Sequence, residues 1–346
     1  MCFHFTEDIG IDLGTANTLI YTKAKGIVLN EPSVIAMNED TKHVMAVGQE
    51  AKEMIGRAPA NVKVVRPLRN GVISDFIMAQ AMLKEFLGRV MQGGSGFRAV
   101  RVVVGVPSGV TGVEKRAVED VVRQMGAKEV FILDEPMAAA IGVGLPVDQP
   151  NGQMVADIGG GTSDIAIIAL GGIVNSVSLR HAGDEMDEAI VAYMRKNYNL
   201  LIGDETAEKI KKTLGCAIED YEFENKEDSS MEAKGRDILS GLPRTITVEA
   251  HDIYKALEEP IAIIVEGIKS TLESAPPELA ADIVVNGMVL AGGGARIKGL
   301  DILIERATGL HVIVAENALE AVAEGTGKSL EQIQKIRRYT AKNNRI

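Results

Sequence analysis

The chain has 346 residues, and its composition, with 46% hydrophobic and 25% charged residues, is that of an ordinary folded, soluble-type protein. The formal charge of −11 argues against a general nucleic-acid partner, because phosphate backbones are bound by clustered Lys and Arg. Two isolated cysteines and five scattered histidines predict neither a disulfide framework nor a zinc site. The length predicts two domains with a cleft between them.

No segment predicts export or a membrane span. No run approaches the ~20 apolar residues that a membrane-spanning helix needs, and no signal peptide is recognisable ahead of Asp8. The negative charge also disfavours attraction to anionic lipid headgroups. We therefore expect a protein of the reducing cytoplasm, with any membrane contact apolar and local.

The first informative element is a glycine turn in the segment Ile9–Asn17, with the sequence IGIDLGTAN. A strand-like approach ends near Asp12, and Gly14 and Thr15 form the turn. Such a turn between strands lets backbone N–H groups approach phosphate oxygens, while the Asp offers a carboxylate to hydrated Mg²⁺. The strands predicted after it cover residues 18–21, 27–29 and 32–37.

A helix is predicted from Thr111, because Thr111 and Glu114 have the capping-box spacing. Its apolar positions repeat every four residues, and Gly126 is expected to end it. Those positions are Val113, Ala117, Val121 and Met125. A strand over 129–133 and a helix of small residues follow, and this alternation indicates an α/β sheet with covered faces.

Glu135 lies just past the strand over 129–133, at the end of the sheet where ligands bind in open α/β folds. There it could orient a water for attack on a terminal phosphoryl group. The alternative is an acid at a helix N-terminus, favoured by the macrodipole ahead of Pro136.

A second glycine turn, Val155–Asp164 with the sequence VADIGGGTSD, places Asp157 at a position 145 residues after Asp12. Predicted strands over 165–170 and 173–179 follow it, so the two halves repeat one topology with almost no identity outside the turns. Either turn alone could be a hairpin end. Their matching settings favour one shared phosphate site.

The remainder predicts helices, an insertion and a third glycine turn. Residues 184–212 are helical in pattern, 221–236 are charged and uneven like an inserted subdomain, and 253–272 form an amphipathic helix ended by Pro276 and Pro277. An apolar strand over 283–290 then runs into Gly292–Gly294. Glu208 and Lys211, three apart on a helix, are by themselves expected to form a solvated ion pair.

The segment Gly325–Ser329, GTGKS, resembles the end of a P-loop. A P-loop requires glycine at position 322, which is Val322, and its approach should be a strand where this one is helical. We interpret the segment as a helix cap. The third turn also lacks the acidic residue that a dinucleotide fingerprint requires.

The three turns, in this order and separation, resemble the two phosphate motifs and the adenosine motif of the superfamily of actin, sugar kinases and heat-shock chaperone ATPases. Within it the chain resembles the MreB family of bacterial actin-like filament proteins, over nearly its whole length. The segments that carry this resemblance are Asp8–Leu19, Val28–Ser33, Arg66–Leu68, Gly71–Ile73, Gly183–Glu185, Gly235–Asp237, Gly241–Pro243 and Gly325–Lys328.

The resemblance implies an actin-like (ribonuclease H-like) α/β fold with two domains, a nucleotide cleft, and a small subdomain on each domain. Subdomain IA would comprise residues 1–31, 66–149 and 315–346, and subdomain IB residues 32–65. Subdomain IIA would comprise 150–180 and 246–314, and subdomain IIB 181–245.

The resemblance also implies the ligand contacts. Asp12 and Asp157 would flank Mg²⁺, mainly through water, and Glu135 with Thr162 would position the attacking water. ATP phosphates would lie against the first two turns, at Gly14, Thr15, Ala16, Asn17, Gly159, Gly160, Gly161 and Thr162. Adenosine and ribose would be enclosed by Glu208, Lys209, Ile210, Lys211, Gly292, Gly293, Gly294 and Ala295.

Two departures from the family are visible. Ser163 and Asp164 stand where many relatives have Thr-Glu, a change expected to keep the turn but able to shift metal or water geometry. The N-terminal segment is too short and too acidic for the amphipathic anchor helix of some relatives. Phe3, Phe5 and Phe97 could insert into a membrane as apolar pegs, or the first two could pack under the first strand.

The implied function is a Mg-dependent ATPase that assembles head to tail into filaments, paired antiparallel on the inner membrane face, and guides cell-wall synthesis and rod shape with shape-determining partners. A small-molecule kinase would need an acceptor-binding insertion, and a peptide-binding chaperone would need a further domain after Lys328. Neither is recognisable. A non-polymerising adaptor or plasmid-segregating relative is disfavoured only by the MreB-like segments.

Overall fold

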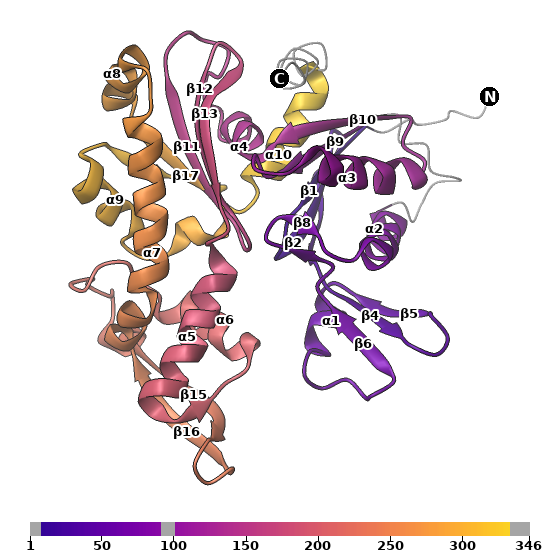
Figure 1. Ribbon diagram of the computed structural model, residues 1–346, viewed down its shortest axis with the longest axis vertical. Helices are drawn as coiled ribbons and strands as arrows, with labels where there is room; N and C mark the ends of the chain where they lie inside the picture. Colours follow the sequence, from indigo (N-terminus) through magenta and orange to yellow (C-terminus); the bar gives the residue numbers. More distant parts are fainter. Residues whose placement is uncertain (1–7, 91–100, 333–346) are drawn as a thin grey trace.

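The computed structural model describes residues 8–90 and 101–332, which form two lobes built on equivalent sheets (Figure 1). In lobe I the strand order is β10-β9-β1-β2-β3, and in lobe II it is β13-β12-β11-β17-β18. The strands of lobe I are β1 (Ile9–Leu13), β2 (Asn17–Thr22), β3 (Gly26–Pro32), β9 (Arg101–Val106) and β10 (Glu129–Asp134). Those of lobe II are β11 (Gln153–Ile158), β12 (Ser163–Ala169), β13 (Gly172–Leu179), β17 (Met288–Ala291) and β18 (Val312–Val314).

The two sheets share one pairing scheme. In each, the first strand pairs antiparallel with the next strand of a meander, β1 with β2 and β11 with β12. On its other side each pairs in parallel with a later strand, β1 with β9 and β11 with β17. The structure therefore confirms the predicted duplication and α/β fold class, and it places Asp12 and Asp157 at matching ends of matching strands.

Each lobe carries a small sheet at its lower end in Figure 1. On lobe I this comprises β4 (Ile35–Asn38), β5 (Val44–Val47) and β6 (Val62–Val65), with α1 (Gln49–Glu53). On lobe II it comprises β14 (Leu200–Leu201), β15 (Ser230–Asp237) and β16 (Pro243–Glu249), with α5 (Gly183–Tyr198) and α6 (Asp204–Leu214). We propose that the four subdomains have the boundaries expected from the sequence.

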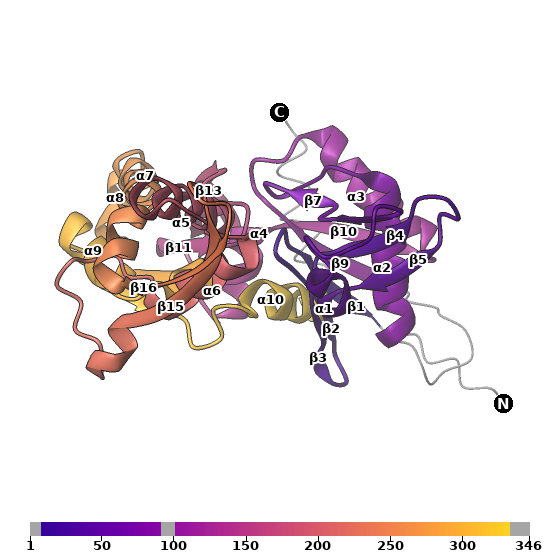
Figure 2. The ribbon, with the colours of Figure 1, turned by 90° about the horizontal axis from the view of Figure 1, so that it is seen from below.

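Helices cover the sheets and join the lobes. Two of them, α4 (Glu135–Gly142) and α10 (Ala321–Ser329), lie between the lobes and share a core with residues of both central sheets (Figure 2). The others that cover sheets are α2 (Phe76–Val90), α3 (Gly112–Gln124), α7 (Ala250–Glu273), α8 (Pro277–Asn286) and α9 (Leu300–Thr308). Short elements complete the chain: β7 (Leu68–Arg69), β8 (Val72–Ile73), η1 (Lys226–Ser229), η2 (Gly293–Arg296) and η3 (Leu330–Gln332).

Three predicted segments are wrong in detail, and the helical pattern over 184–212 is confirmed as two helices, α5 and α6, separated by β14. The strand predicted over 283–290 is instead the end of α8 followed by β17. The strand predicted over 32–37 begins only at Ile35. Gly325–Ser329 is not a helix cap but the interior and last turns of α10. A Cβ atom at Gly325 would lie 1.8 Å from the Ala138 carbonyl oxygen, so this glycine permits close helix packing.

The capping box at Thr111 is confirmed, since its hydroxyl accepts from Glu114 N and the Glu114 carboxylate accepts from Thr111 N. The predicted apolar stripe of α3 is partly wrong, because Val113 is 79% exposed. The buried residues are Val118, Val121 and Val122, which have the i, i+3, i+4 spacing of a helix face.

Candidate nucleotide site

The first two glycine turns meet across the lobes. A Cβ atom at Gly160 would lie 2.6 Å from Ala16 Cβ, and one at Gly161 would lie 2.6 Å from Thr15 Oγ1. Only glycine permits this approach at both positions. Thr15 Oγ1 also accepts a hydrogen bond of 2.9 Å from Gly71 N, which fixes the first turn to the loop between β7 and β8.

The third turn packs against the end of β11. Gly292 has φ +81°, and a Cβ atom there would lie 2.3 Å from Ile158 O and 2.6 Å from Asp157 Oδ1. The Gly292 N–H donates to Ala318 O at 2.7 Å. The structure therefore brings Gly292 next to Asp157, as the shared-site hypothesis requires.

Four carboxyl groups gather behind the turns. Asp12 is half-buried, whereas Glu135, Asp157 and Asp164 are almost completely buried. Burial raises the pKa of Asp12 from 3.8 to about 7. Burial, and then the charges of Asp12 and Asp164, raise the pKa of Asp157 well above its usual value.

Glu135 belongs to the same group. It is the first residue of α4, the position that the helix N-terminal alternative also requires, and its side chain is buried. Its pKa is raised well above the usual value, first by burial and then by the charges of Asp164, Asp12 and Asp157. Perturbed carboxyl groups of this kind concentrate at functional sites.

The helix expected to flank adenosine has different contacts from those predicted. Glu208 and Lys211 do not pair with each other. The Glu208 carboxylate accepts from Lys52 Nζ (2.5 Å) and Lys212 Nζ (2.7 Å), and Lys211 Nζ donates to Gly183 O and to Asp187 Oδ2. Burial raises the pKa of Glu208, but the hydrogen bonds from Lys212 and Lys52 outweigh it and lower the pKa to about 2.

The other two residues of the segment 208–211 differ in burial, since Lys209 is exposed and Ile210 is fully buried in the lobe II core. The Ile210 side chain therefore packs inside the lobe. Lys52 belongs to α1 of lobe I, so its ion pair with Glu208 joins the two lobes.

Comparison with known proteins decides the family. The family model for MreB/Mbl protein matches residues 6–338 of the chain. The chain belongs to the MreB/Mbl protein family.

Relatives in this family include the cell shape-determining protein MreB of Escherichia coli K12, which is 49% identical over 95% of this chain and 94% of its own. The cell shape-determining protein Mbl of Bacillus subtilis is 46% identical over 96% of this chain and 98% of its own. The crystal structure of MreB5 of Spiroplasma citri bound to ADP has a TM-score of 0.89 and 39% identity, covering 95% of this chain and 97% of that one. MreB5 bound to AMPPNP has the same TM-score and 38% identity, covering 98% and 99%.

A less similar solved structure has the same fold. The MamK double helical filament has a TM-score of 0.79 at 23% identity, covering 94% of this chain and 98% of that one, and it shares the actin-like fold. The predicted fold class and MreB-like identity are therefore confirmed.

Asp164 and Ser108 were missed as site residues for this MreB/Mbl chain. Asp157 and Asp164 are directly opposite each other in the β11–β12 pair, which brings Asp164 to the site. Burial raises the pKa of Asp164, against the lowering effect of hydrogen bonds from the backbone and side chain of Ser108. The acid at the far end of the second turn was a readable signal for Asp164, but its contact with Ser108 was not.

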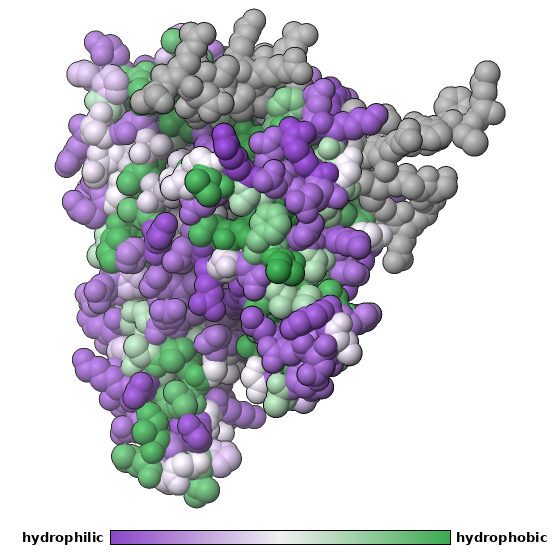
Figure 3. All heavy atoms as spheres, turned by 45° about the vertical axis from the view of Figure 1, so that its right-hand side comes forward, coloured by the Kyte–Doolittle hydropathy of each residue, from purple (hydrophilic) through white to green (hydrophobic). Residues whose placement is uncertain are grey.

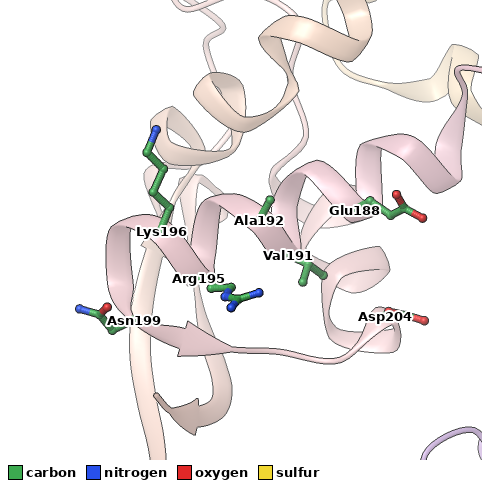
Figure 4. A pocket seen from close by; sticks show the side chains of 7 residues that line it. All are labelled: Glu188, Val191, Ala192, Arg195, Lys196, Asn199 and Asp204. Atoms are coloured by element: carbon green, nitrogen blue, oxygen red, sulfur yellow. The ribbon is translucent and has the colours of Figure 1, made fainter. Parts of the chain in front are cut away.

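One further feature lies apart from the nucleotide site of this MreB/Mbl member. A hollow of about 530 Å³ lies along α5, and none of its lining residues belongs to the three turns (Figure 4). It is lined by Glu188, Val191, Ala192, Arg195, Lys196, Asn199 and Asp204. The candidate membrane residues Phe3, Phe5 and Phe97 lie outside the described residues. Within residues 8–90 and 101–332, no helix has the length and apolar character needed to cross a bilayer.

Proposed function

We propose that this chain binds ATP with Mg²⁺ between its lobes, hydrolyses it, and assembles into actin-like filaments that help determine cell shape. The observation that carries the proposal is the contact of two glycine turns from opposite lobes beside one half-buried and three buried carboxyl groups. Names of relatives support it, since MreB5 was crystallised with ADP and AMPPNP and the E. coli relative is named for cell shape.

Phosphates would be held by the backbone N–H groups of residues 14–17 and 159–162, because only glycine turns let oxygens approach the backbone closely. Glu208, Lys211 and the turn at 292–295 would enclose adenosine and ribose. Since Glu208 and Lys211 already have ionic partners, they would offer the ribose hydroxyls charged hydrogen-bonding groups of fixed position.

The residues present fit Mg²⁺ held through water. No group of three or more His, Cys, Asp or Glu in the described part of the chain could hold a metal directly. Asp12 and Asp157 nevertheless lie close enough that the charge of Asp12 raises the pKa of Asp157, and a bound cation would offset this repulsion. When bound with the phosphates, Mg²⁺ would neutralise their charge, and Asp12 and Asp157 would hold its water ligands.

Glu135 would orient the attacking water and accept its proton, assisted by the Thr162 hydroxyl. A raised pKa suits this role, because a general base works best when its pKa approaches the working pH.

Self-assembly is supported by exposed apolar side chains on α8 and on the β15–β16 hairpin, two elements at opposite ends of lobe II in Figure 1. In Figure 3 apolar side chains gather at the lower tip of the molecule, where the hairpin lies. The tip of the β15–β16 hairpin exposes Ile238, Leu239 and Leu242, and the end of α8 exposes Val284 and Val285. A contact between two different surfaces of this kind repeats without closing and builds a filament. Antiparallel pairing of such filaments, the inner membrane surface and cell-wall synthesis proteins are the partners we propose beyond self-contact.

Sedimentation and electron microscopy with ATP, ADP, AMPPNP or no nucleotide, with and without anionic liposomes, test this function. We expect ATP- or AMPPNP-dependent filaments, phosphate release that EDTA abolishes, and co-sedimentation with liposomes. ATP turnover without any polymer would favour a kinase or an adaptor on the same fold. Failure to bind nucleotide at all would refute the proposal.

A further inference from the structure

Ser108 and Asp164 form a buried hydrogen-bonded contact between the lobes. Ser108 follows β9 in lobe I, and Asp164 is the second residue of β12 in lobe II. Asp164 Oδ1 accepts from the Ser108 backbone N–H and from the Ser108 hydroxyl, both at 2.8 Å. Asp164 has no exposed surface, and hydrogen bonding from Ser178 and Thr162, both in lobe II, lowers the pKa of its carboxyl in addition to that from Ser108. A carboxylate so deeply buried requires a specific reason for its presence.

The loop that carries Ser108 is tightly seated on lobe II. A Cβ atom at Gly109 would lie 2.9 Å from Ser178 Cβ on β13, so residue 109 has no room for a side chain. At Gly71, a Cβ atom would lie 2.4 Å from Pro107 Cγ and 2.9 Å from Thr162 Cγ2. The loop over 107–109 and the β7–β8 loop therefore contact the second turn together.

Both ends of the contact are tied directly to the phosphate-binding turns. Asp164 pairs with Asp157 across the β11–β12 hairpin, and the second turn is the loop of that hairpin, closed by a 2.9 Å hydrogen bond from Gly159 N to Thr162 O. On the other side, Gly105 pairs with Asp12 in the β1–β9 ladder, three residues before Ser108. A displacement of either turn must therefore stretch or release the hydrogen bonds between Ser108 and Asp164.

We propose that Asp164 is a positioning residue that fastens the second glycine turn to lobe I through Ser108, so that phosphate binding and lobe closure occur as one event. This inference rests on the proposed function, since it concerns how the ATP-binding turns are brought together. Asp164 does not need to touch nucleotide for this role. It stabilises the closed arrangement of the lobes, because its hydrogen bonds to Ser108 would be absent when the lobes are apart.

The test measures lobe closure directly. Spin labels at Lys63 on β6 and Lys234 on β15, both exposed, report the distance between the lobes by pulsed electron resonance, with Cys2 and Cys216 replaced by Ala. In the otherwise unchanged chain, saturating AMPPNP with Mg²⁺ should narrow the distance distribution. In Asp164→Ala the distribution should stay broad, and a fluorescent ATP analogue should dissociate about tenfold faster, as expected for the loss of hydrogen bonds to a charged group.

Matched variants distinguish loss of the hydrogen bonds to Ser108 from loss of folding. Asp164→Asn keeps an acceptor oxygen of the same geometry and should close almost normally, whereas Ser108→Ala keeps only the backbone donor and should dissociate the analogue about threefold faster. Glu305→Ala loses bonds from Val312 N and His311 Nδ1 within lobe II alone and should close like the parent. Melting curves confirm folding, and Ser108→Ala carries the test if Asp164→Ala does not fold.

Closure and dissociation in Asp164→Ala indistinguishable from the parent would overturn the inference while leaving the proposed function intact. The inference is overturned equally if Asp164→Ala is misfolded and Ser108→Ala dissociates the analogue at the parent rate. If the parent chain itself neither binds AMPPNP nor closes, the proposed function fails first, and the two failures are therefore distinguishable.

Discussion

Gly160 of lobe II and Ala16 of lobe I are so close that a methyl group on residue 160 would lie 2.6 Å from Ala16 Cβ and 3.1 Å from Ala16 N. Neither atom can rotate away, because one is backbone and the other is bonded directly to it. The nucleotide-binding arrangement therefore depends on the absence of a side chain at residue 160. The lobes can avoid such a clash only by moving apart.

The first prediction is that Gly160→Ala weakens AMPPNP binding at least about tenfold, equivalent to about 1.4 kcal/mol, while the melting temperature changes little. Binding measured by fluorescence titration checks it. Gly88→Ala is the control, since no atom lies within 4 Å of a Cβ there and alanine stabilises an exposed helix position by about 0.5–1 kcal/mol. Unaltered nucleotide affinity in Gly160→Ala would contradict the proposed clamp.

The second prediction concerns Glu135. Glu135→Gln keeps the size of the side chain but removes the proton acceptor, so phosphate release should slow by about 100-fold or more. AMPPNP affinity should stay within about threefold, because the residue acts on water and not on binding. Glu119→Gln, on the outward side of α3 and paired with Arg123, is the control. Normal turnover in Glu135→Gln would remove it from this role.

The third prediction is a pH dependence at Asp12. Burial raises the pKa of this carboxyl from 3.8 to about 7, so its favourable contribution to folding is complete only below pH 3.8 and is lost as the pH rises through 7. Without nucleotide, Asp12→Asn should therefore be more stable than the parent at pH 8. Since Asp12 is only half-buried, we expect about 1–3 kcal/mol.

Denaturant titrations at several pH values measure this difference, which should shrink toward zero as the pH falls from 8 to 4. A gap that widens on acidification would show that the sign is wrong. With Mg²⁺ and ATP present the variant should lose its stability advantage over the parent, because Asp12→Asn removes a carboxylate proposed to hold water ligands of the metal. Affinity should then fall in the variant and stay unchanged in Glu305→Gln, which lies outside the site.

Much of the fold could be read from the sequence because the strands alternate with turn residues in two matching halves. The errors fell where periodicity is ambiguous. The apolar run from Ile283 fits a buried strand or a buried helix, and only the start of α8 at Pro277 and its end at Gly287, with φ +75°, resolve it. Val113 shows a second limit, since a hydrophobic residue in the first turn of a helix can simply remain exposed.

The site could be predicted where its residues are local to a turn, as with Asp12 and the glycines around Gly160. It could not be predicted where a role depends on distant partners. Asp164 is hydrogen-bonded to Ser108, which is 56 residues away in the sequence, and Glu208 is hydrogen-bonded to Lys52, which is 156 residues away. No pattern within a short window can report such contacts, since they arise only when the two lobes pack.

The fourth prediction concerns the two apolar ends of lobe II. Leu239→Asp at the hairpin tip and Val285→Asp at the end of α8 should each prevent pelleting with ATP, because a buried unpaired charge costs far more than an exposed one. Both side chains are more than 80% exposed, so the monomer should fold and bind nucleotide normally. Ile77→Asp, an exposed position on α2 of lobe I, should still polymerise. Filaments from either lobe II variant would place the longitudinal contact elsewhere.

The fifth prediction concerns the helix pair between the lobes. A Cβ atom would lie 1.8 Å from the opposing carbonyl oxygen at both Gly325, which faces Ala138, and Gly142, which faces Ala321. Gly325→Ala must therefore separate α10 from α4 and should destabilise the protein by about 2–3 kcal/mol, measured as a lower denaturation midpoint. Because α4 begins with Glu135, phosphate release should also slow in the folded fraction. Gly203→Ala is the control, since no atom lies within 4 Å of a Cβ there, and it should leave stability and phosphate release unchanged. Equal stability of the two variants would refute the packing argument.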